Sequence, residues 1–335
     1  MRGLQIVDGY TSALTLRETQ KAIKLVKDTF ANELAAALNL ERVSAPFIVK
    51  KGSGINDDLN GVERKVEFDI KEIEGTAEIV QSLAKWKRTA LKAYGYGVDE
   101  GLYTNMNAIR RDDDCDNVHS IFVDQWDWER VISKEERNVE FLKDIVKKIV
   151  GAIDNTQKIA HKAFPQLKKE LATDVFFITT QELEDMYPDK TPKEREDIIT
   201  KEKGVVFIMQ IGDLLKSGIK HDGRAPDYDD WKLNGDLLFW NETLRHAFEV
   251  SSMGIRVDSE SLAYQLKAAN AEDRMKYDYH KGIADGTLPL TIGGGIGQSR
   301  LSMLILEKAH IGEVQVSLWP DKMVEDCKNN GINLL

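Results

Sequence analysis

The chain has 335 residues, of which 42% are hydrophobic and 30% charged, the ordinary composition of a globular protein. Asp and Glu number 56 against 46 Lys and Arg, and the resulting net charge of −10 argues against nucleic acid as an obligate partner. The two cysteines, Cys115 and Cys327, are too few for a disulfide framework or a thiolate metal site, so we expect a reducing compartment, the cytoplasm. No stretch approaches the roughly 18 apolar residues of a transmembrane helix, and the N-terminus has no apolar signal segment, so we expect no membrane association.

No repeat, low-complexity tract or Pro/Ser-rich linker divides the sequence, so we expect a single domain over residues 1–335. Thr15 and Glu18 form a capping box that begins a long one-faced helix, and Asn39 is a plausible left-handed stop. Residues 40–49 follow as a strand interrupted by Pro46, which tolerates only an edge position or a bulge. A long helix that leads into an edge strand is a natural dimer surface.

Further elements follow along the chain. Residues 83–93 and 139–153 have helical patterns, and Thr191, Pro192 and Glu194 mark another helix start. The unbroken apolar run at residues 205–211 indicates a buried strand.

Residues 101–110 and 120–129 are predicted to form two strands joined by a polar loop, RDDDCDNV, that is long enough to close over a ligand. Alternate residues of a strand share a face, so Gln125, Asp127 and Glu129 point one way. Asp124, Trp126 and Trp128 point the other way. Three polar groups on one face of a Trp-rich strand either face solvent or line a cleft.

The last third of the chain carries AFEVSSMGIRVD (residues 247–258) and GGGIGQSRLSML (residues 293–304). We interpret the second string as a glycine-rich turn followed by a helix with Arg300 in its first turn, an arrangement that presents free backbone N–H groups to an anion. The alternative is an ordinary turn that caps a buried helix. Gln298 and Ser299 exclude the dinucleotide and phosphate-loop patterns. The two strings together predict a nucleotide site.

These motifs resemble those of class II aminoacyl-tRNA synthetases, nearest to the aspartyl type. Arg110, the acidic loop and the polar strand face resemble the strand–loop–strand motif, and the segment from Glu249 to Arg256 resembles the acid and arginine before the last motif. The segment from Gly293 to Arg300 resembles the last motif itself, and the first helix resembles the motif that builds the dimer interface. The resemblance implies an α+β fold, a mainly antiparallel sheet flanked by helices.

Over nearly its whole length the chain is similar to one family of that superfamily, the ammonia-dependent asparagine synthetases or aspartate–ammonia ligases. The similarity is carried by SLAKWKR (82–88), EGLYTNM (100–106), VDQWDWERV (123–131), RAPDYDDW (224–231), LNGD (233–236) and SSMGIRVD (251–258). No segment is left for an anticodon-binding domain. The resemblance implies a homodimer that activates L-aspartate with ATP, releasing pyrophosphate, and in which ammonia then displaces AMP from the β-aspartyl adenylate.

Other functions remain open at this point. An aspartyl- or asparaginyl-tRNA synthetase relative predicts a basic face and an added domain, and neither is visible in the sequence. A non-catalytic paralogue is expected to lack Arg110, Glu249 or Arg300, and all three are present. A glutamine-dependent enzyme needs an N-terminal Cys nucleophile, whereas position 2 is Arg. We therefore expect ammonia as the nitrogen source.

The resemblance also implies the nucleotide contacts. Arg110 is expected to hold the α-phosphate, and Arg300 the adenine face or the terminal phosphates, with Gly295 and Glu249 in the ATP/AMP site. Asp236 and Glu249, predicted at the ends of two apolar strands, would repel each other unless a cation such as Mg²⁺ lay between them. We expect no organic cofactor.

Adenine stacking is expected to be incomplete. Synthetases of this group usually carry an aromatic residue two places before the motif glutamine, and here that place is Val123, while Phe122 is expected to point to the opposite face.

For the amino acid, the resemblance implies that Gln125 and Asp127 face the ammonium group and that Lys87 and Arg256 face carboxylates, with Ser251 and Ser252 as hydroxyl donors. Without the resemblance, the group Lys85, Lys87 and Arg88 would indicate a solvated helix face. Ammonium has no lone pair, so a carboxylate must take its proton. Asp57 and Asp229 are the candidates, both predicted on Gly- or Pro-bearing loops that could close as lids, although such Asp residues most often make local turn bonds.

Overall fold

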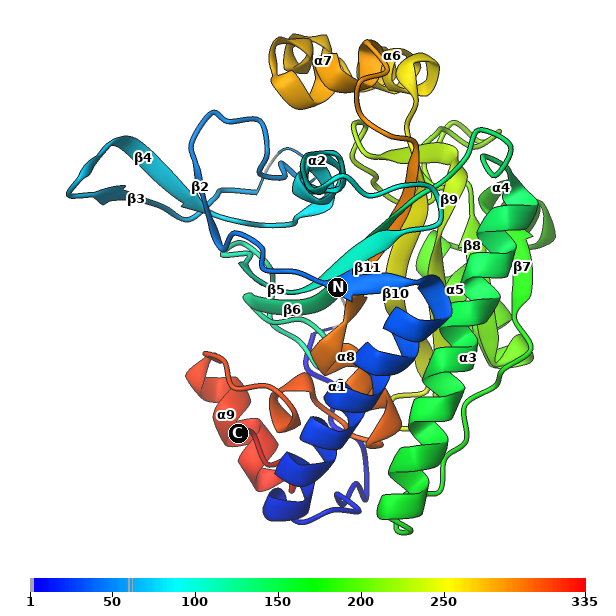
Figure 1. Cartoon of the computed structure of the whole chain (residues 1–335). Coiled ribbons are helices and arrows are strands. Elements are labelled where there is room, and N and C mark those ends of the chain that lie inside the picture. The colour runs from blue at the N-terminus through cyan, green and yellow to red at the C-terminus, as the bar shows by residue number, and fades with distance from the viewer. Residues whose placement is uncertain (1–2, 60, 62) are drawn as a thin grey trace.

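The structure is a computed structural model that describes residues 3–59, 61 and 63–335. An eight-stranded sheet forms its centre, with the strand order β1-β5-β6-β11-β10-β9-β8-β7 (Figure 1). The two outermost pairs, β1–β5 and β7–β8, are parallel and the others are antiparallel. These strands are β1 (Leu40–Arg42), β5 (Gly101–Ile109), β6 (Phe122–Val131), β7 (Phe176–Thr179), β8 (Val205–Met209), β9 (Asp229–Asn241), β10 (His246–Arg256) and β11 (Thr291–Gly297). The predicted fold class, a mainly antiparallel sheet flanked by helices, is confirmed.

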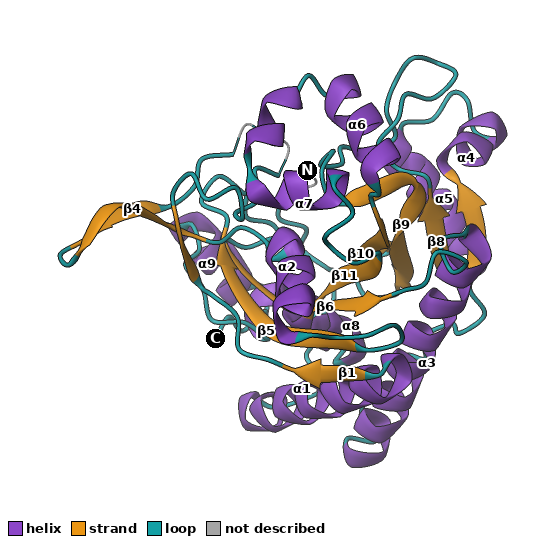
Figure 2. Ribbon diagram, turned by 45° about the horizontal axis from the view of Figure 1, so that its top comes forward, coloured by secondary structure: helices purple, strands orange, loops and turns teal. Residues whose placement is uncertain are grey.

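The helices cover the sheet on both faces and at one end (Figures 1 and 2). They are α1 (Leu16–Leu38), α2 (Ala84–Tyr94), α3 (Val139–Ala163), α4 (Thr180–Met186), α5 (Pro192–Lys203), α6 (Ser259–Ala268), α7 (Asp278–Ala284), α8 (Gln298–Ile305) and α9 (Asp321–Asn329), with short 3-10 turns η1 (Glu272–Lys276) and η2 (Ile311–Glu313). None of the helices in the described ranges combines the length and hydrophobicity needed to cross a bilayer.

The two faces of β6 have different surroundings. Trp126 and Trp128 are buried in the main core with the apolar side of α1, and the Phe30 and Trp126 rings lie 4.6 Å apart between centroids. The opposite face of β6 carries Gln125 and Asp127, which line a cleft. The alternation predicted from the sequence therefore separates core from cleft.

The start and end of α1 agree with the sequence. Thr15 and Glu18 form the capping box, and Asn39 ends the helix with a left-handed φ of 55°. The single strand predicted at residues 40–49 is wrong, because the segment forms two short strands and Pro46 lies between them. β1 joins the edge of the main sheet, while β2 (Ile48–Lys50) joins β3 (Glu67–Ile70) and β4 (Ile73–Ile79) in a small sheet that projects from the body (Figure 2).

The other predicted elements are present. The helix predicted at residues 83–93 corresponds to α2, which begins one residue later, residues 139–153 form the first part of α3, and the capping box at Thr191 begins α5. Residues 205–211 contain β8, and the paired strands 101–110 and 120–129 correspond to β5 and β6.

The prediction of a glycine-rich turn is wrong. The segment forms strand β11, which pairs with β6 on one side and β10 on the other. A Cβ atom on Gly294 would lie 2.5 Å from the Cβ of Met253, and one on Gly295 would lie 2.4 Å from the Gln125 side-chain oxygen. The glycines are thus required for close approach of neighbouring strands and side chains. Helix α8 begins immediately afterwards and places Arg300 in its first turn, as predicted.

Candidate active site

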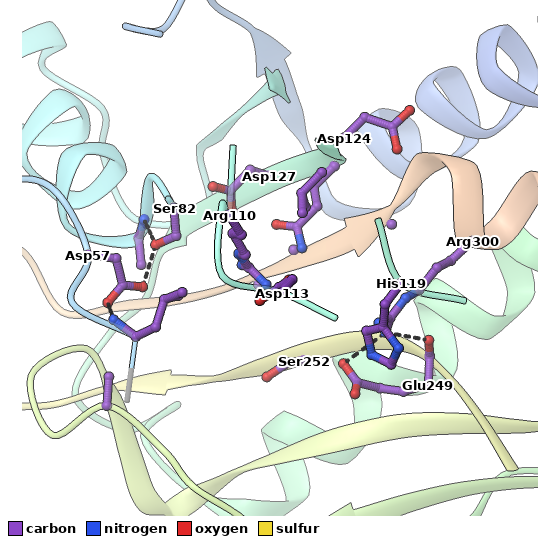
Figure 3. Close-up of a pocket in the computed structure, with 18 of the residues that line it drawn as sticks. Asp57, Ser82, Arg110, Asp113, His119, Asp124, Asp127, Glu249, Ser252 and Arg300 are labelled. Carbon is purple, nitrogen blue, oxygen red and sulfur yellow. Dashed lines mark hydrogen bonds and ion pairs between the residues drawn. The ribbon is translucent and has the colours of Figure 1, made fainter. Parts of the chain in front are cut away.

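A cleft of about 590 Å³ opens on the polar face of β6, a volume typical of small-molecule sites. All but two of the predicted site residues line it: Asp57, Lys87, Arg110, Gln125, Asp127, Asp229, Glu249, Ser252, Arg256, Gly295 and Arg300. Asp236 and Ser251 are the two that do not. In Figure 3, Asp57 and Ser82 lie on one side and Arg300 and Glu249 on the other. We call the part around Lys87, Asp127 and Arg256 the buried end, and the part around Arg110, Glu249 and Arg300 the open end.

Lys87 is at the centre of the buried end and is fully buried. Its ammonium group contacts the Asp127 carboxylate and donates to the Trp128 carbonyl oxygen at 3.0 Å. Burial lowers the pKa of Lys87, and the charge of Asp127 opposes this shift. Lys85 and Arg88 are also buried. The solvated helix face that composition alone suggested is therefore wrong.

Arg256 joins two acids in the same buried end. Its guanidinium lies 3.1 Å from a Glu129 carboxylate oxygen and also pairs with Asp229. Burial lowers the pKa of Arg256, but Glu129 and Asp229 outweigh burial and raise it above the ordinary value. Asp229 is the first residue of β9, and its carboxylate is fixed by the ion pair with Arg256. The prediction that Asp229 lies on a mobile loop that closes over the site is therefore wrong.

The two serines of β10 point to opposite sides. The Ser251 hydroxyl donates to the Gly295 carbonyl oxygen at 3.0 Å, within the sheet. The Ser252 hydroxyl lines the cleft and accepts a hydrogen bond from Arg224 at 2.6 Å. Only Ser252 is placed to meet a ligand directly.

The arginines of the open end have few protein partners. Among the described residues, the side-chain hydrogen bonds of Arg110, just after β5, are two long ones of 3.3 and 3.4 Å to the Gln81 carbonyl oxygen. Arg300 donates to the Glu249 carbonyl oxygen at 3.1 Å and lies 3.6 Å from that residue's carboxylate. Cations in such a cleft are available to an anionic ligand.

Asp236 and Glu249 lie within β9 and β10 rather than at strand ends, which corrects the prediction. Burial raises the pKa of Asp236 to about 6, although Arg224, at 2.6 Å, opposes the shift, and Glu249 adds to it. Burial also raises the pKa of Glu249, but Arg300 and Lys193 outweigh burial and hold it below the ordinary value.

The two acids thus repel each other, which a hard cation between them would relieve. Within the described part of the chain, no group of three or more His, Cys, Asp or Glu side chains could hold a metal alone. The donor set fits an ion held largely by ligand phosphates.

Asp57 lies in the loop of residues 52–59 and is nearly fully buried. Its carboxylate accepts hydrogen bonds from the Ser82 hydroxyl at 2.7 Å and from the Leu59 backbone N–H at 2.9 Å. The second of these is the local turn bond expected of such a residue. The first fixes the carboxylate against the start of α2, at the wall of the cleft.

Several lining residues were not predicted, among them Ser82, His119, Arg224 and Tyr228. Arg224 stands in the RAPDYDDW string, but nothing in the sequence indicates that it reaches Ser252 and Asp236. Phe122 and Val123 both line the cleft, so Phe122 contributes to its wall although strand alternation predicted the opposite face.

A family model described as aspartate-ammonia ligase matches residues 17–331. A protein of Clostridium tetani named aspartate–ammonia ligase is 61% identical over 327 residues, which cover 97% of this chain and 96% of that protein. A protein of Ruminiclostridium cellulolyticum with the same name is 59% identical, with 100% of both chains covered.

Among solved structures, the asparaginyl-tRNA synthetase of Entamoeba histolytica in complex with asparaginyl-adenylate matches with a TM-score of 0.67 and 15% identity, over 90% of this chain and 66% of that one. The asparaginyl-tRNA synthetase of Pyrococcus horikoshii, also complexed with asparaginyl-adenylate, gives 0.66 and 16%, over 90% and 70%. At this identity the likeness shows the fold alone, the class II synthetase catalytic fold. Together with the family match and the full-length relatives, these findings mean that the chain belongs to the aspartate–ammonia ligase family of enzymes.

Proposed function

We propose that this protein joins L-aspartate and ammonia to form L-asparagine, with ATP converted to AMP and pyrophosphate through a β-aspartyl adenylate. The observation that carries the proposal is that one cleft combines two kinds of surface. The buried end presents alternating acids and cations, which suit a zwitterionic dicarboxylic acid, and the open end presents arginines with few protein partners, which suit phosphates.

In the first step, the side-chain carboxylate of aspartate attacks the α-phosphorus of ATP and displaces pyrophosphate. Arg110 stabilises the charge that develops on the α-phosphate oxygens, because a guanidinium offers forked donors. Arg300 contacts the adenine face or the terminal phosphates. Mg²⁺ bound with ATP would be held by Asp236 and Glu249 and would neutralise phosphate charge.

The buried end orients aspartate. Asp127 and Gln125 receive its ammonium group, while Lys87, Arg256 and the Ser252 hydroxyl meet its carboxylates. Because Lys87 and Arg256 are already paired with Asp127, Glu129 and Asp229, the site is ordered before the substrate arrives. Ser251 contributes indirectly, since its hydroxyl holds the Gly295 carbonyl.

In the second step, ammonia attacks the β-carbonyl carbon of the adenylate, and AMP leaves. Asp57 attracts ammonium and takes its proton, which leaves the nitrogen lone pair free for attack. Its carboxylate lines the cleft and is oriented by Ser82. Asp229, the other candidate base, is engaged by Arg256, and this pairing makes Asp57 the stronger choice.

The assembly and compartment belong to the same proposal. A homodimer formed through α1 and the adjoining edge strand would cover Leu16, an exposed apolar residue at the start of α1. Both Cys115 and Cys327 are unpaired, in keeping with a cytoplasmic location.

The test is to incubate the purified protein with ATP, Mg²⁺ and L-aspartate, with ammonium or glutamine in parallel, and to measure asparagine and AMP. Asparagine with equimolar AMP from ammonium alone is the expected result. Aspartate-dependent exchange of pyrophosphate into ATP without asparagine would instead identify an activating site with a different acceptor, as in a tRNA synthetase relative. Absence of both reactions would contradict the proposal.

A further inference from the structure

A buried ionic cluster lies next to the cleft, beneath the helical segment that contains η1 and α7. Its centre is Asp227, which is fully buried. One carboxylate oxygen of Asp227 lies 3.2 Å from Lys85 Nζ, 2.9 Å from an Arg274 guanidinium nitrogen and 3.0 Å from His280 Nε2. Among the described residues, the other oxygen has no hydrogen-bond partner. Three basic groups from α2, η1 and α7 thus converge on one acid.

Two of these basic groups, Lys85 and Arg274, also contact the loop of residues 52–59. Lys85 donates to the Asn56 carbonyl oxygen at 3.1 Å, and Arg274 lies 3.6 Å from the Asp58 carboxylate. Asn56 and Asp58 flank Asp57 directly. Asp227 is therefore linked through one intermediate side chain to the residue on each side of Asp57.

The same helical segment also contacts the loop by packing. Gly54 has a left-handed φ of 74°, and a Cβ atom there would lie 2.4 Å from the ring of Tyr277, the residue between η1 and α7. Only glycine lets the loop backbone approach this ring so closely. The loop is thus fixed by an ionic link and by a packing contact, and both lead to the 272–280 segment.

The charges of the cluster favour an ionised Asp227. Burial alone would raise the pKa of this carboxyl, but Lys85, His280 and Arg274 outweigh burial and hold it well below the ordinary value. Loss of the negative charge would leave Lys85 and Arg274 without their shared buried counter-ion. Both side chains would then reorient, and with them the backbone around Asp57.

We propose that Asp227 is a positioning residue for ammonia use, and that it holds the 52–59 loop through Lys85 and Arg274 so that Asp57 faces the bound adenylate. The inference rests on the function proposed above, in which Asp57 acts in the second step. Among the described residues, the hydrogen-bond partners of Arg256 are Glu129 and Asp229, and that of Arg300 is Glu249, all outside the loop. Adenylate formation should therefore depend much less on the position of the loop than amide formation does.

The test compares the two half-reactions in Asp227→Asn, which keeps the side-chain shape and removes the charge. We expect aspartate-dependent pyrophosphate exchange within about threefold of the wild type, and a KM for ammonium raised by about tenfold or more, the size of one lost charged contact. Trypsin should also cleave faster at Lys51 and Lys65, which flank the loop. Asp273→Asn is the matched control, because Asp273 is an exposed acid of the same segment whose ion pair, among the described residues, is with Lys276.

A second variant keeps the proposal testable if Asp227→Asn does not fold. Gly54→Ala should push the loop of residues 52–59 away from Tyr277 and produce the same rise in the KM for ammonium, whereas Arg274→Lys should retain most of the wild-type value. An unchanged KM for ammonium in Asp227→Asn and Gly54→Ala, or an equal loss of both half-reactions, would contradict the positioning role of Asp227. If the wild type itself makes no asparagine from ammonium, the proposed function is wrong. That result differs from one in which the wild type is active and only the role of Asp227 is contradicted.

Discussion

The buried and open ends of the cleft treat charge differently. In the buried end, Lys87 and Arg256 each contact a carboxylate directly and are almost completely inaccessible to solvent. In the open end, the described partner of the Arg110 guanidinium is the Gln81 carbonyl oxygen at 3.3 and 3.4 Å, and that of Arg300 is Glu249; the Arg300 side chain keeps 23% of its exposure. Buried charges must be paired to be tolerated, whereas charges near solvent can remain available.

Under the proposed function, this difference assigns aspartate recognition to the buried end and ATP chemistry to the open end. A small, fixed zwitterion is best recognised by groups that are ordered in advance, because little conformational entropy is then lost on binding. A triphosphate brings its own negative charge and can supply the partners that the open-end arginines lack. Substitutions should therefore affect folding at the buried end and activity at the open end.

The largest effect is expected for Arg256→Ala. The change removes the cation that pairs with buried Asp229 and leaves buried Glu129 with Lys87, 3.9 Å away, so the free energy of unfolding should fall by about 3–5 kcal/mol. Denaturant titration measures this loss, and calorimetry on any folded fraction should find weakened aspartate binding with ATP binding nearly intact. Arg256→Lys should recover most of the stability. Unchanged stability in Arg256→Ala would remove the distinction between the two ends.

Arg300→Ala should lower kcat by roughly a hundredfold, equivalent to about 3 kcal/mol of lost transition-state stabilisation, while thermal stability stays near that of the wild type. The reason is that Arg300 has few protein contacts to lose. Steady-state kinetics and a melting curve measure the two effects. Arg111→Ala, an exposed arginine outside the lining of the cleft, is the control and should behave as the wild type. Kinetics of Arg300→Ala within threefold of the wild type would exclude it from the site.

The proposed Mg²⁺ site at Asp236 and Glu249 predicts a pH dependence that tests the open end. Burial raises the pKa of Asp236 to about 6, so the carboxyl is ionised above this pH and protonated below it. Protons then compete with the cation, and the apparent affinity for Mg²⁺ should fall about tenfold for each pH unit below 6. Titration of activity with Mg²⁺ between pH 5 and 8 measures this. Asp236→Asn should bind Mg²⁺ weakly over the whole pH range, and its affinity should not change with pH. If the pH profile of this variant matches that of the wild type, another group causes the pH dependence.

The smallest effects are expected for the two adjacent serines of β10, Ser251 and Ser252. Ser252→Ala should raise the KM for aspartate by roughly fivefold, the size of about 1 kcal/mol from one hydroxyl contact. Ser251→Ala should leave this KM nearly unchanged, because its hydroxyl is used inside the sheet. Steady-state kinetics on both variants compares them directly. The reverse order would mean that the sheet changes register when aspartate binds.

Local patterns predicted a large part of the fold. The capping boxes at Thr15 and Thr191, the left-handed Asn39 and the alternation of β6 each depend on residues a few positions apart, and the structure confirms them. The order of the motifs was likewise enough to indicate the family. Such features are determined by short-range geometry, which a single sequence contains in full.

Long-range packing decided the rest. The charged side of α2 looks solvated in sequence, yet Lys87 is buried because Asp127, from β6, compensates its charge. The glycine-rich segment looks like a turn, yet it is β11, since Gln125 and Met253 occupy the space that its side chains would fill. Asp227 gives no signal of its own, because its three basic partners come from separate helical elements. The sequence by itself determined which local elements form and which residue types the site contains, but only the tertiary structure decided which charges are buried, paired or left for a ligand, since burial and pairing depend on segments far apart along the chain.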